Sequence, residues 1–221
     1  MDNIFAVNKP KGITSFDVVY KIRKKTGVKR VGHGGTLDPL ATGVLVIAVG
    51  REATKQLDKY VKGEKEYIAT IKLGFTSTTD DEEGEKREIN TEYIPSTEEI
   101  EETLKSFIGN IHQIPPIYSA IKINGKRAYK IARKSEKENS TTATPKMEPR
   151  EVKIKDIQLL SYDYPILKIK VTTGPGVYIR SLARDIGEKL KTGAYLTDLQ
   201  RTRVGEFIIE NAKEIEDIKF E

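Results

Sequence analysis

The chain has 221 residues, 37% of them hydrophobic and 32% charged, and its 38 Lys and Arg against 33 Asp and Glu give a net charge of +5. It has no cysteine and only two histidines, which excludes disulfides and thiolate metal sites and disfavours a histidine-rich metal centre. The longest apolar run, Val44 to Val49, is far shorter than the ~20 residues of a membrane helix, and the N-terminus lacks a signal-peptide core. We therefore expect one domain in the cytoplasm, without membrane contact.

The N-terminal third predicts a strand, a helix and a second strand. The stretch IFAVNKPKG is typical of a short strand, and TSFDVVYKIRKKTG predicts a helix because Thr14 and Asp17 have the spacing of a capping box. A Gly-rich loop with a single carboxylate, Asp38, precedes the apolar run of residues 44–49. That run indicates a strand buried on both faces.

The middle of the chain begins with an alternating strand and an acidic run. In KEYIATIKLGF, apolar residues alternate from Tyr67 to Phe75, which predicts a half-buried strand. From Asp80 to Glu102 there are eleven acids and two bases, which we interpret as a solvated loop and a solvated helix face. The helix STEEIEETLKSFIG should be capped by Ser96 and turn four residues inward: Ile100, Leu104, Phe107 and Ile108.

A basic segment follows, beginning with QIPPIYSAIKINGKRAYKIAR. It continues into KSEKENSTTATPKMEP, which is polar and poor in apolar residues and predicts a mobile loop. A basic, tyrosine-containing, flexible arm suits binding to a polyanion, and a solvated hairpin is the alternative.

The C-terminal third returns to strands. REVKIKDIQLLSYDY and ILKIKVTTG are expected to be strands separated by a turn at Pro165, and VYIRSLARDIGEKLKTG a strand end that runs into a helix. VGEFIIE should be followed by a short last helix. Strands and helices mix without regular βαβ alternation, which favours an α+β fold.

Five blocks in this order carry a family resemblance: NKPKGITSFDVV, GHGGTLDPLATGVLVIAVGREATK, KEYIATIKLG, IPPIYSAIKINGKRAYKIAR and GVYIRSLARDIGEKL. From Val7 to about Gly205 the chain resembles the TruB family of tRNA pseudouridine synthases. The resemblance implies a cofactor-free and metal-free isomerase that acts on the T-loop uridine of tRNA. As partner it implies the T-arm stem-loop of tRNA, bound by a monomer.

The same resemblance implies the architecture. The catalytic domain would span residues 1–221, with a mixed, largely antiparallel sheet flanked by helices. The basic insertion at 113–149 resembles the family's RNA-clamping thumb. Many relatives carry a small RNA-binding domain of the PUA type after the catalytic part, and we expect none within residues 1–221.

The family's catalytic carboxylate matches Asp38 in this chain. It would serve as a nucleophile or a base, and attack on C1′, attack on C6 and proton abstraction at C2′ all remain open. The target base must leave its stack to reach such a pocket. Around the acid, glycines are expected to let phosphate and ribose approach the backbone.

The resemblance assigns substrate contacts to five further residues: His33, Tyr67, Tyr178, Arg180 and Leu199. Tyr67 would stack on the extruded uracil, while Leu199 would pack against it and Tyr178 would line its site. Arg180 would pair with Asp38 through a forked hydrogen bond, and Tyr178 would share a strand face with it. His33 would contact the RNA.

Some positions depart from the family pattern or have weaker assignments. Phe16 stands where the family often has His, Ser77 replaces the acid of a T-D-T pattern, and Ser135 replaces a frequent Gly. Lys9 is a candidate for a structural or phosphate-binding role. Two other functions compete with the isomerase: an RNA chaperone that refolds tRNA without chemistry, and a catalytic subunit of a guide-RNA particle.

Overall fold

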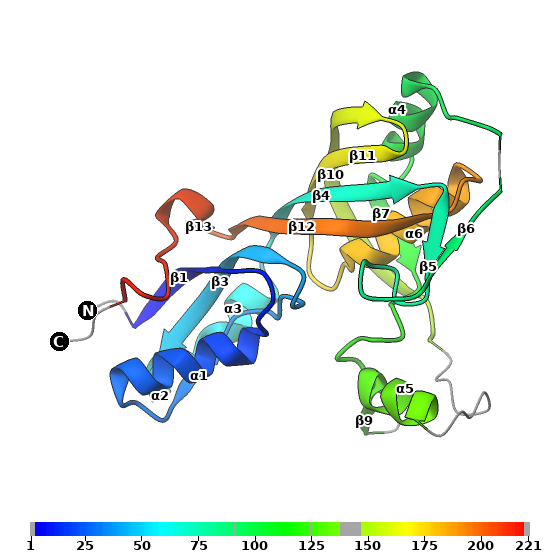
Figure 1. Ribbon diagram of the computed structural model, residues 1–221. Helices are drawn as coiled ribbons and strands as arrows, with labels where there is room; N and C mark the ends of the chain where they lie inside the picture. Colours follow the sequence, from blue (N-terminus) through cyan, green and yellow to red (C-terminus); the bar gives the residue numbers. More distant parts are fainter. Residues whose placement is uncertain (1–2, 91, 124, 138–146, 219–221) are drawn as a thin grey trace.

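The computed structural model describes the chain except residues 1–2, 91, 124, 138–146 and 219–221. One sheet runs through the molecule (Figure 1), with strand order β1-β3-β12-β4-β11-β10-β7, while β2 pairs with β3 and β13 with β12. Its strands are β1 (Ile4–Lys9), β2 (Val31–His33), β3 (Thr42–Val49), β4 (Lys65–Leu73), β7 (Gly109–Gln113), β10 (Arg150–Asp163), β11 (Ile166–Thr173), β12 (Ala194–Val204) and β13 (Phe207–Ile208).

The pairings make this sheet mixed but largely antiparallel. Only β12 and β3 run parallel among the described pairs, through Gln200 beside Thr42 and Arg201 beside Gly43. Two small hairpins stand apart from the sheet, β5 (Phe75–Ser77) with β6 (Lys86–Glu88), and β8 (Lys122–Ile123) with β9 (Lys126–Arg127). The α+β fold predicted from the sequence is confirmed.

The helices are α1 (Ser15–Thr26), α2 (Arg51–Lys55), α3 (Leu57–Val61), α4 (Thr97–Lys105), α5 (Ala128–Lys137) and α6 (Ile179–Lys189). The predicted capping box of α1 is present, because the Thr14 hydroxyl accepts from Asp17 N and the Asp17 carboxylate accepts from Thr14 N. Ser96 and Glu99 cap α4 in the same way. A sequence pattern of a few residues therefore fixes where both helices begin.

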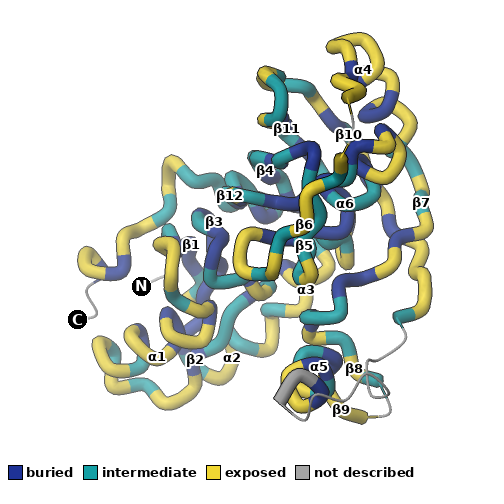
Figure 2. The backbone as a smooth tube through the Cα atoms, turned by 45° about the vertical axis from the view of Figure 1, so that its right-hand side comes forward, coloured by how far each residue is buried: buried dark blue, intermediate teal, exposed yellow. Residues whose placement is uncertain are grey.

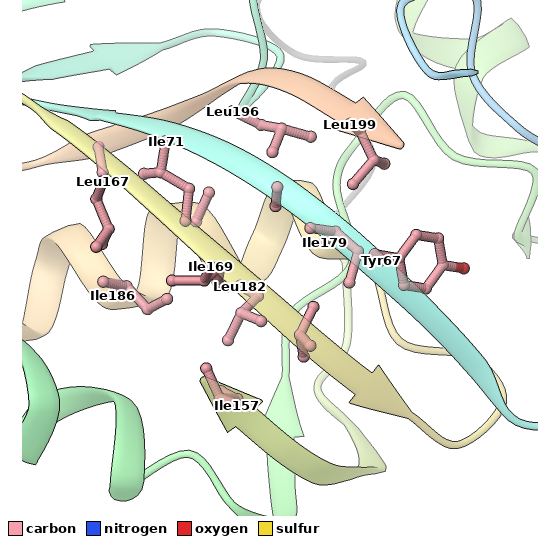
Figure 3. Close-up of a cluster of buried hydrophobic side chains, with 14 of the residues drawn as sticks. Tyr67, Ile71, Ile157, Leu167, Ile169, Ile179, Leu182, Ile186, Leu196 and Leu199 are labelled. Carbon is pink, nitrogen blue, oxygen red and sulfur yellow. The ribbon is translucent and has the colours of Figure 1, made fainter. Parts of the chain in front are cut away.

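Two main apolar clusters form the cores of the two ends of the molecule. Figure 2 shows the buried positions along the backbone. The larger cluster joins β4, β10, β11 and β12 to α6 and α4 (Figure 3), and the second packs α1 against β1, β2 and β3. The strand β3 is buried at every position from Gly43 to Val49, as its apolar sequence predicted. The long strand β12 reaches from one end to the other and so connects the two clusters.

Three local predictions are wrong. Phe75 belongs to β5 rather than to the alternating strand, because Gly74 turns the chain with a φ of 85°. Ile108 is 43% exposed, since α4 ends at Lys105 and the helical period no longer applies beyond it. After β13, a short 3-10 helix at Ile209–Asn211 replaces the expected last helix, and no α-helix follows it up to residue 218.

The reason for that last difference is a backbone contact with the first strand. Lys213 N donates to Ala6 O at 3.0 Å, and Asn8 N donates to Lys213 O at 2.9 Å. The C-terminal segment is thereby held extended beside β1, which excludes helical geometry at Lys213. Among the described residues, no helix is long and apolar enough to cross a membrane.

Candidate active site

Asp38 lies in the loop of residues 34–41 between β2 and β3, called here the Asp38 loop. Its neighbours are fixed by hydrogen bonds from the first turn of α1 and the segment before it. Ser15 Oγ donates to Leu37 O at 3.0 Å and accepts from Leu37 N at 2.8 Å, while Gly12 N donates to Pro39 O at 2.8 Å. The backbone on both sides of Asp38 is thus held, whereas its side chain remains 39% exposed.

A buried arginine supports the loop from inside the protein. The Arg201 side chain is almost completely buried, and its Nε donates to Val44 O at 2.8 Å and its Nη2 to Gly35 O at 3.0 Å. A longer contact of 3.5 Å joins Nη1 to Thr36 O. Burial lowers the pKa of Arg201, and the neighbouring Tyr67 opposes that shift. No sequence pattern had indicated a role for Arg201.

Lys9 supports the same loop from β1. Its Nζ donates to the carbonyls of Pro10 and Ile13, both at 2.8 Å, and lies 3.5 Å from Pro39 O. The side chain is fully buried, and burial lowers its pKa to about 8 while the charge of Asp38 opposes the shift. The phosphate-binding alternative for Lys9 is therefore wrong, because its ammonium group is directed at backbone carbonyls and has no access to solvent.

The glycines around the loop serve packing within the protein. A Cβ at Gly43 would lie 2.3 Å from Arg201 O, where β3 and β12 run in parallel, and one at Gly34 would lie 2.9 Å from Tyr60 Cβ. Real Cβ atoms do not approach other atoms so closely, so both positions require glycine. The expectation that these glycines open the backbone to phosphate and ribose is wrong at Gly34 and Gly43, because protein atoms occupy that space.

Arg180, the second residue of α6, reaches Asp38 with one nitrogen. Its Nε lies 3.0 Å from Asp38 Oδ2, and its side chain is 6% exposed. The other two nitrogens are directed elsewhere: Nη1 lies 3.2 Å from both Asp81 Oδ2 and Thr79 O, and Nη2 donates to Tyr118 O at 2.9 Å. The predicted pairing is confirmed, but the predicted fork is wrong because the remaining donors already have acceptors.

Asp81 completes this network and was missed by the sequence analysis. Its side chain is 4% exposed, and Oδ1 accepts from Thr79 Oγ1 at 2.5 Å and from Glu83 N at 3.0 Å. Two negative groups therefore face the Arg180 guanidinium, one buried and one at the surface. A buried carboxylate with a guanidinium partner and two further donors is a stable arrangement.

Asp80 is a second acid of this run, interpreted above as solvated, that has a fixed partner; its side chain is 15% exposed. It contacts Arg184 Nη1 at 2.9 Å, and burial raises the pKa of Asp80 to about 6, against the opposing charge of Arg184. Arg180 and Arg184 are one helical turn apart on α6, so each takes one of the two adjacent acids. The spacing of Arg180 and Arg184 was the available signal in the sequence, because residues four apart lie on one helix face and can pair with two adjacent acids.

Tyr67 and Leu199 lie on neighbouring strands beside this network. Tyr67 on β4 is directly opposite Arg201 on β12, and Leu199 is opposite Ala69, so the Tyr67 and Leu199 side chains are diagonal neighbours on one face. Both are over nine-tenths buried. In Figure 3 the Tyr67 ring lies at one end of the apolar cluster, next to Ile179, with its hydroxyl directed away from it.

Tyr178 and His33 border the site from the other elements. Tyr178 caps α6 with extended φ and ψ of −102° and 115°, and Gln113 bonds both its backbone N and O, so no strand face is shared with Arg180 as predicted. Burial raises the pKa of the Tyr178 hydroxyl. His33 ends β2; its Nδ1 is buried with no hydrogen-bond partner among the described residues, and burial lowers the pKa of its imidazole.

Comparison with known proteins places this arrangement in a family. The model of the TruB family pseudouridylate synthase N-terminal domain matches residues 23–179, and the model of the tRNA pseudouridylate synthase B C-terminal domain matches residues 180–220. The chain belongs to the TruB family. The family resemblance of the five sequence blocks is thereby confirmed.

Individual relatives agree with this assignment. The chain is 46% identical to tRNA pseudouridine synthase B of Parabacteroides distasonis, over 97% of this chain and 91% of that protein. It is 48% identical to the protein of the same name from Phocaeicola vulgatus, over 95% and 88%. A second 46% match, in Clostridium novyi, covers 97% of this chain and 71% of the relative.

Solved structures support the fold. A chain from a Cbf5-Nop10-Gar1 complex superposes with a TM-score of 0.74 at 29% identity, and one from an H/ACA RNP bound to a substrate RNA containing 2′-deoxyuridine with 0.69 at 27%. Each match covers 97% of this chain, which spans about half the length of those two chains.

In this TruB-family chain, the basic insertion has a fixed base and an outer part. At the base, Ile114 O accepts from Ser181 Oγ and Arg184 Nη2, both at 2.8 Å. The outer part is the β8–β9 hairpin with α5, named here the arm (residues 118–137). Contrary to the predicted mobile loop, α5 continues through residues 134–137; the part of that loop at 138–146 lies outside the described residues.

Proposed function

We propose that this protein isomerises a uridine of tRNA to pseudouridine, with Asp38 as the reacting carboxylate. The carrying observation is the 3.0 Å contact between Arg180 Nε and Asp38 Oδ2, which holds a partly exposed acid against a buried cation. The family membership supports the reaction, and relatives named tRNA pseudouridine synthase B support tRNA as the substrate.

The reaction is an isomerisation and requires no net oxidant or reductant. The N1–C1′ bond of the uridine breaks, the uracil turns, C5 bonds to C1′, and the proton lost from C5 is balanced by one gained at N1. Asp38 either attacks C1′ or C6, or removes the C2′ proton, and the three routes need the same group in the same place. No step calls for a metal or a cofactor.

Arg180 sets the orientation of that carboxylate. Its other nitrogens are held by Asp81, Thr79 O and Tyr118 O, so the guanidinium has one fixed position. We propose that Asp38 Oδ2 stays on Arg180 while Oδ1 faces the sugar. Preorganisation of this kind reduces the rearrangement needed to reach the transition state.

The uracil would occupy the space beside Tyr67 and Leu199. An extruded base stacked on an aromatic ring gains ~1–3 kcal/mol, which offsets part of the cost of unstacking it from the RNA. Tyr178 would line the site and His33 would contact the RNA near the target. The T-loop uridine is the proposed target, as the family resemblance implies.

The arm would clamp the RNA backbone. It presents exposed cations on the hairpin and on α5: Lys122, Lys126, Arg127, Lys130, Arg133 and Lys134. A T-arm stem-loop bound by one copy of the chain in the cytoplasm is the proposed complex, and phosphate contacts of this kind add affinity without reading sequence.

The test is the mapping of pseudouridine in tRNA after incubation with the purified protein. We expect one modified T-loop uridine with the wild type and none with Asp38→Asn. Tight tRNA binding without any pseudouridine would contradict the proposal and favour the chaperone.

A further inference from the structure

The exposed face of α1 carries two aromatic rings that the proposed site does not use. Phe16 is 60% exposed and Tyr20 51%, and they lie four residues apart, so both are on one face of the helix. Aromatic side chains are usually buried in a core or an interface. Two adjacent exposed rings therefore form a small apolar patch that is available for binding.

Each ring has a cation beside it. Arg23 Cζ lies 5.5 Å from the centre of the Phe16 ring, and Lys24 Nζ lies 4.8 Å from the centre of the Tyr20 ring. Both rings are more than half exposed with these cations in place. Arg23 is also fixed by its bond from Nη2 to Val31 O at 3.0 Å, so the face has a defined shape.

The charge around the rings is strongly positive. Exposed cations extend from the helix into the following turn: Lys21, Lys24, Lys25, Lys29 and Arg30. The one acid of α1, Asp17, is engaged in the helix cap, where its carboxylate accepts from both Thr14 N and Thr14 Oγ1. A surface that combines rings and cations matches the bases and phosphates of single-stranded RNA.

The first turn of α1 is also next to the reacting group. Ser15, which precedes Phe16, holds Leu37 through two hydrogen bonds, and Leu37 precedes Asp38. Figures 1 and 2 both place α1 and α5 at the lower end of the molecule, on opposite sides. An RNA held by the arm and entering the site at Asp38 would therefore continue toward α1.

We propose that the exposed face of α1, with Phe16 and Tyr20 as stacking rings and Arg23 and Lys24 as phosphate partners, binds unpaired nucleotides of the substrate RNA. This rests on the proposed function for the identity of the RNA. Unpaired nucleotides are required because the bases of a duplex already stack on one another and do not offer their faces.

The experiment is equilibrium binding of the full chain to whole tRNA and to a blunt RNA duplex at one salt concentration. Phe16→Ala with Tyr20→Ala should weaken tRNA binding by at least about 5-fold, because at least one base stack is lost. Phe16→Leu with Tyr20→Leu should lose as much, since leucine keeps an apolar surface but no ring. Phe16→Tyr with Tyr20→Phe should bind like the wild type.

Two controls make the result specific. Tyr93→Ala removes an exposed ring that hydrogen-bonds Glu99 of α4 and should leave tRNA affinity unchanged, because α4 and α1 lie at opposite ends of the molecule in Figure 1. Duplex affinity should stay constant in all variants. Because both rings are exposed, the thermal midpoint should not move, which removes misfolding as an explanation.

The outcomes separate this inference from the proposed function. Wild-type tRNA affinity in the double alanine variant would overturn the inference, even if the protein forms pseudouridine. Equal losses for tRNA and duplex would overturn it too, because stacking is not involved. A ring-dependent loss of tRNA affinity in a protein that forms no pseudouridine would overturn the proposed function but support RNA binding by the α1 face.

Discussion

The Asp38 loop and the arm are both proposed to face the same RNA, but they are built in opposite ways. The loop is held from the protein interior by the buried cations Lys9 and Arg201, which donate hydrogen bonds to backbone carbonyls. The arm closes on itself: Ala128 N donates to Ile121 O and Tyr129 N to Ser119 O. Cations thus serve rigidity in the loop and lie at the surface in the arm.

This difference follows from what each part has to do. A reacting carboxylate must be positioned within a fraction of an ångström, so its support has to come from groups that cannot move. An RNA backbone is contacted at several phosphates through screened charges, and small displacements of one lysine cost little. The comparison can be tested by substitutions in each region.

The largest effect is expected for Asp38→Asn. The change is nearly isosteric but removes the reacting carboxylate, so turnover should fall by at least about 10²-fold while tRNA binding stays within a few-fold. Single-turnover rates and equilibrium binding are the measurements. Multiple-turnover conversion by a clean preparation would remove Asp38 from the mechanism.

Arg201→Lys should harm the loop through its support. A single ammonium cannot reach Val44 O and Gly35 O together as the guanidinium does, and an unpaired buried carbonyl costs about 1–3 kcal/mol. We expect the free energy of unfolding to drop by that amount, and kcat to fall more than KM rises.

The matched control for this variant is Arg127→Lys in the arm, where the side chain is exposed. Urea unfolding and steady-state kinetics should be unchanged there. If both substitutions were equally harmless, the contrast between a fixed loop and an adaptable arm would be lost.

A smaller effect is expected from charge removal in the arm. Lys126→Ala, Arg127→Ala and Lys130→Ala together should leave kcat intact and weaken tRNA binding. Each lost phosphate contact should reduce the slope of log K against log salt by roughly 0.7–0.9. A titration over several salt concentrations measures this slope, and an unchanged slope would favour the solvated-hairpin alternative.

Many features of the loop and its surroundings could be predicted from the sequence, and some could not. Local signals fixed α1 through Thr14 and Asp17, and the family blocks led to Asp38 and Arg180. Arg201 was missed because its role depends on the parallel contact of β12 with β3, which pairs residues far apart in the chain.

The acidic run of residues 80–102 is the second feature that could not be predicted correctly from the sequence. Eleven acids in one stretch predict solvation on average. The average does not describe Asp80, which is partly buried, or Asp81, which is buried; they pair with Arg184 and Arg180, about 100 residues later. The roles of Arg201 and of these two acids depend on tertiary partners, which the composition of a segment does not reveal.

The smallest effect concerns Asp80, whose burial makes the stability of the protein depend on pH. Its pKa is raised from 3.8 to about 6 in the folded protein, chiefly by burial. Between these two values the folded protein binds a proton that the unfolded chain does not, so stability decreases as the pH rises from about 4 to about 6. Arg184 opposes the shift and keeps the decrease modest.

Asp80→Asn removes this titration and keeps a side chain that can accept from Arg184. The free energy of unfolding of the variant should therefore fall less than that of the wild type over the same pH interval, and the two curves should run parallel above about pH 7, where Asp80 is ionised in both states. Urea unfolding at a series of pH values measures the difference. Curves that stay parallel through the whole interval would mean that Asp80 titrates alike in the folded and unfolded chain, and that the pair it forms with Arg184 fully offsets its burial.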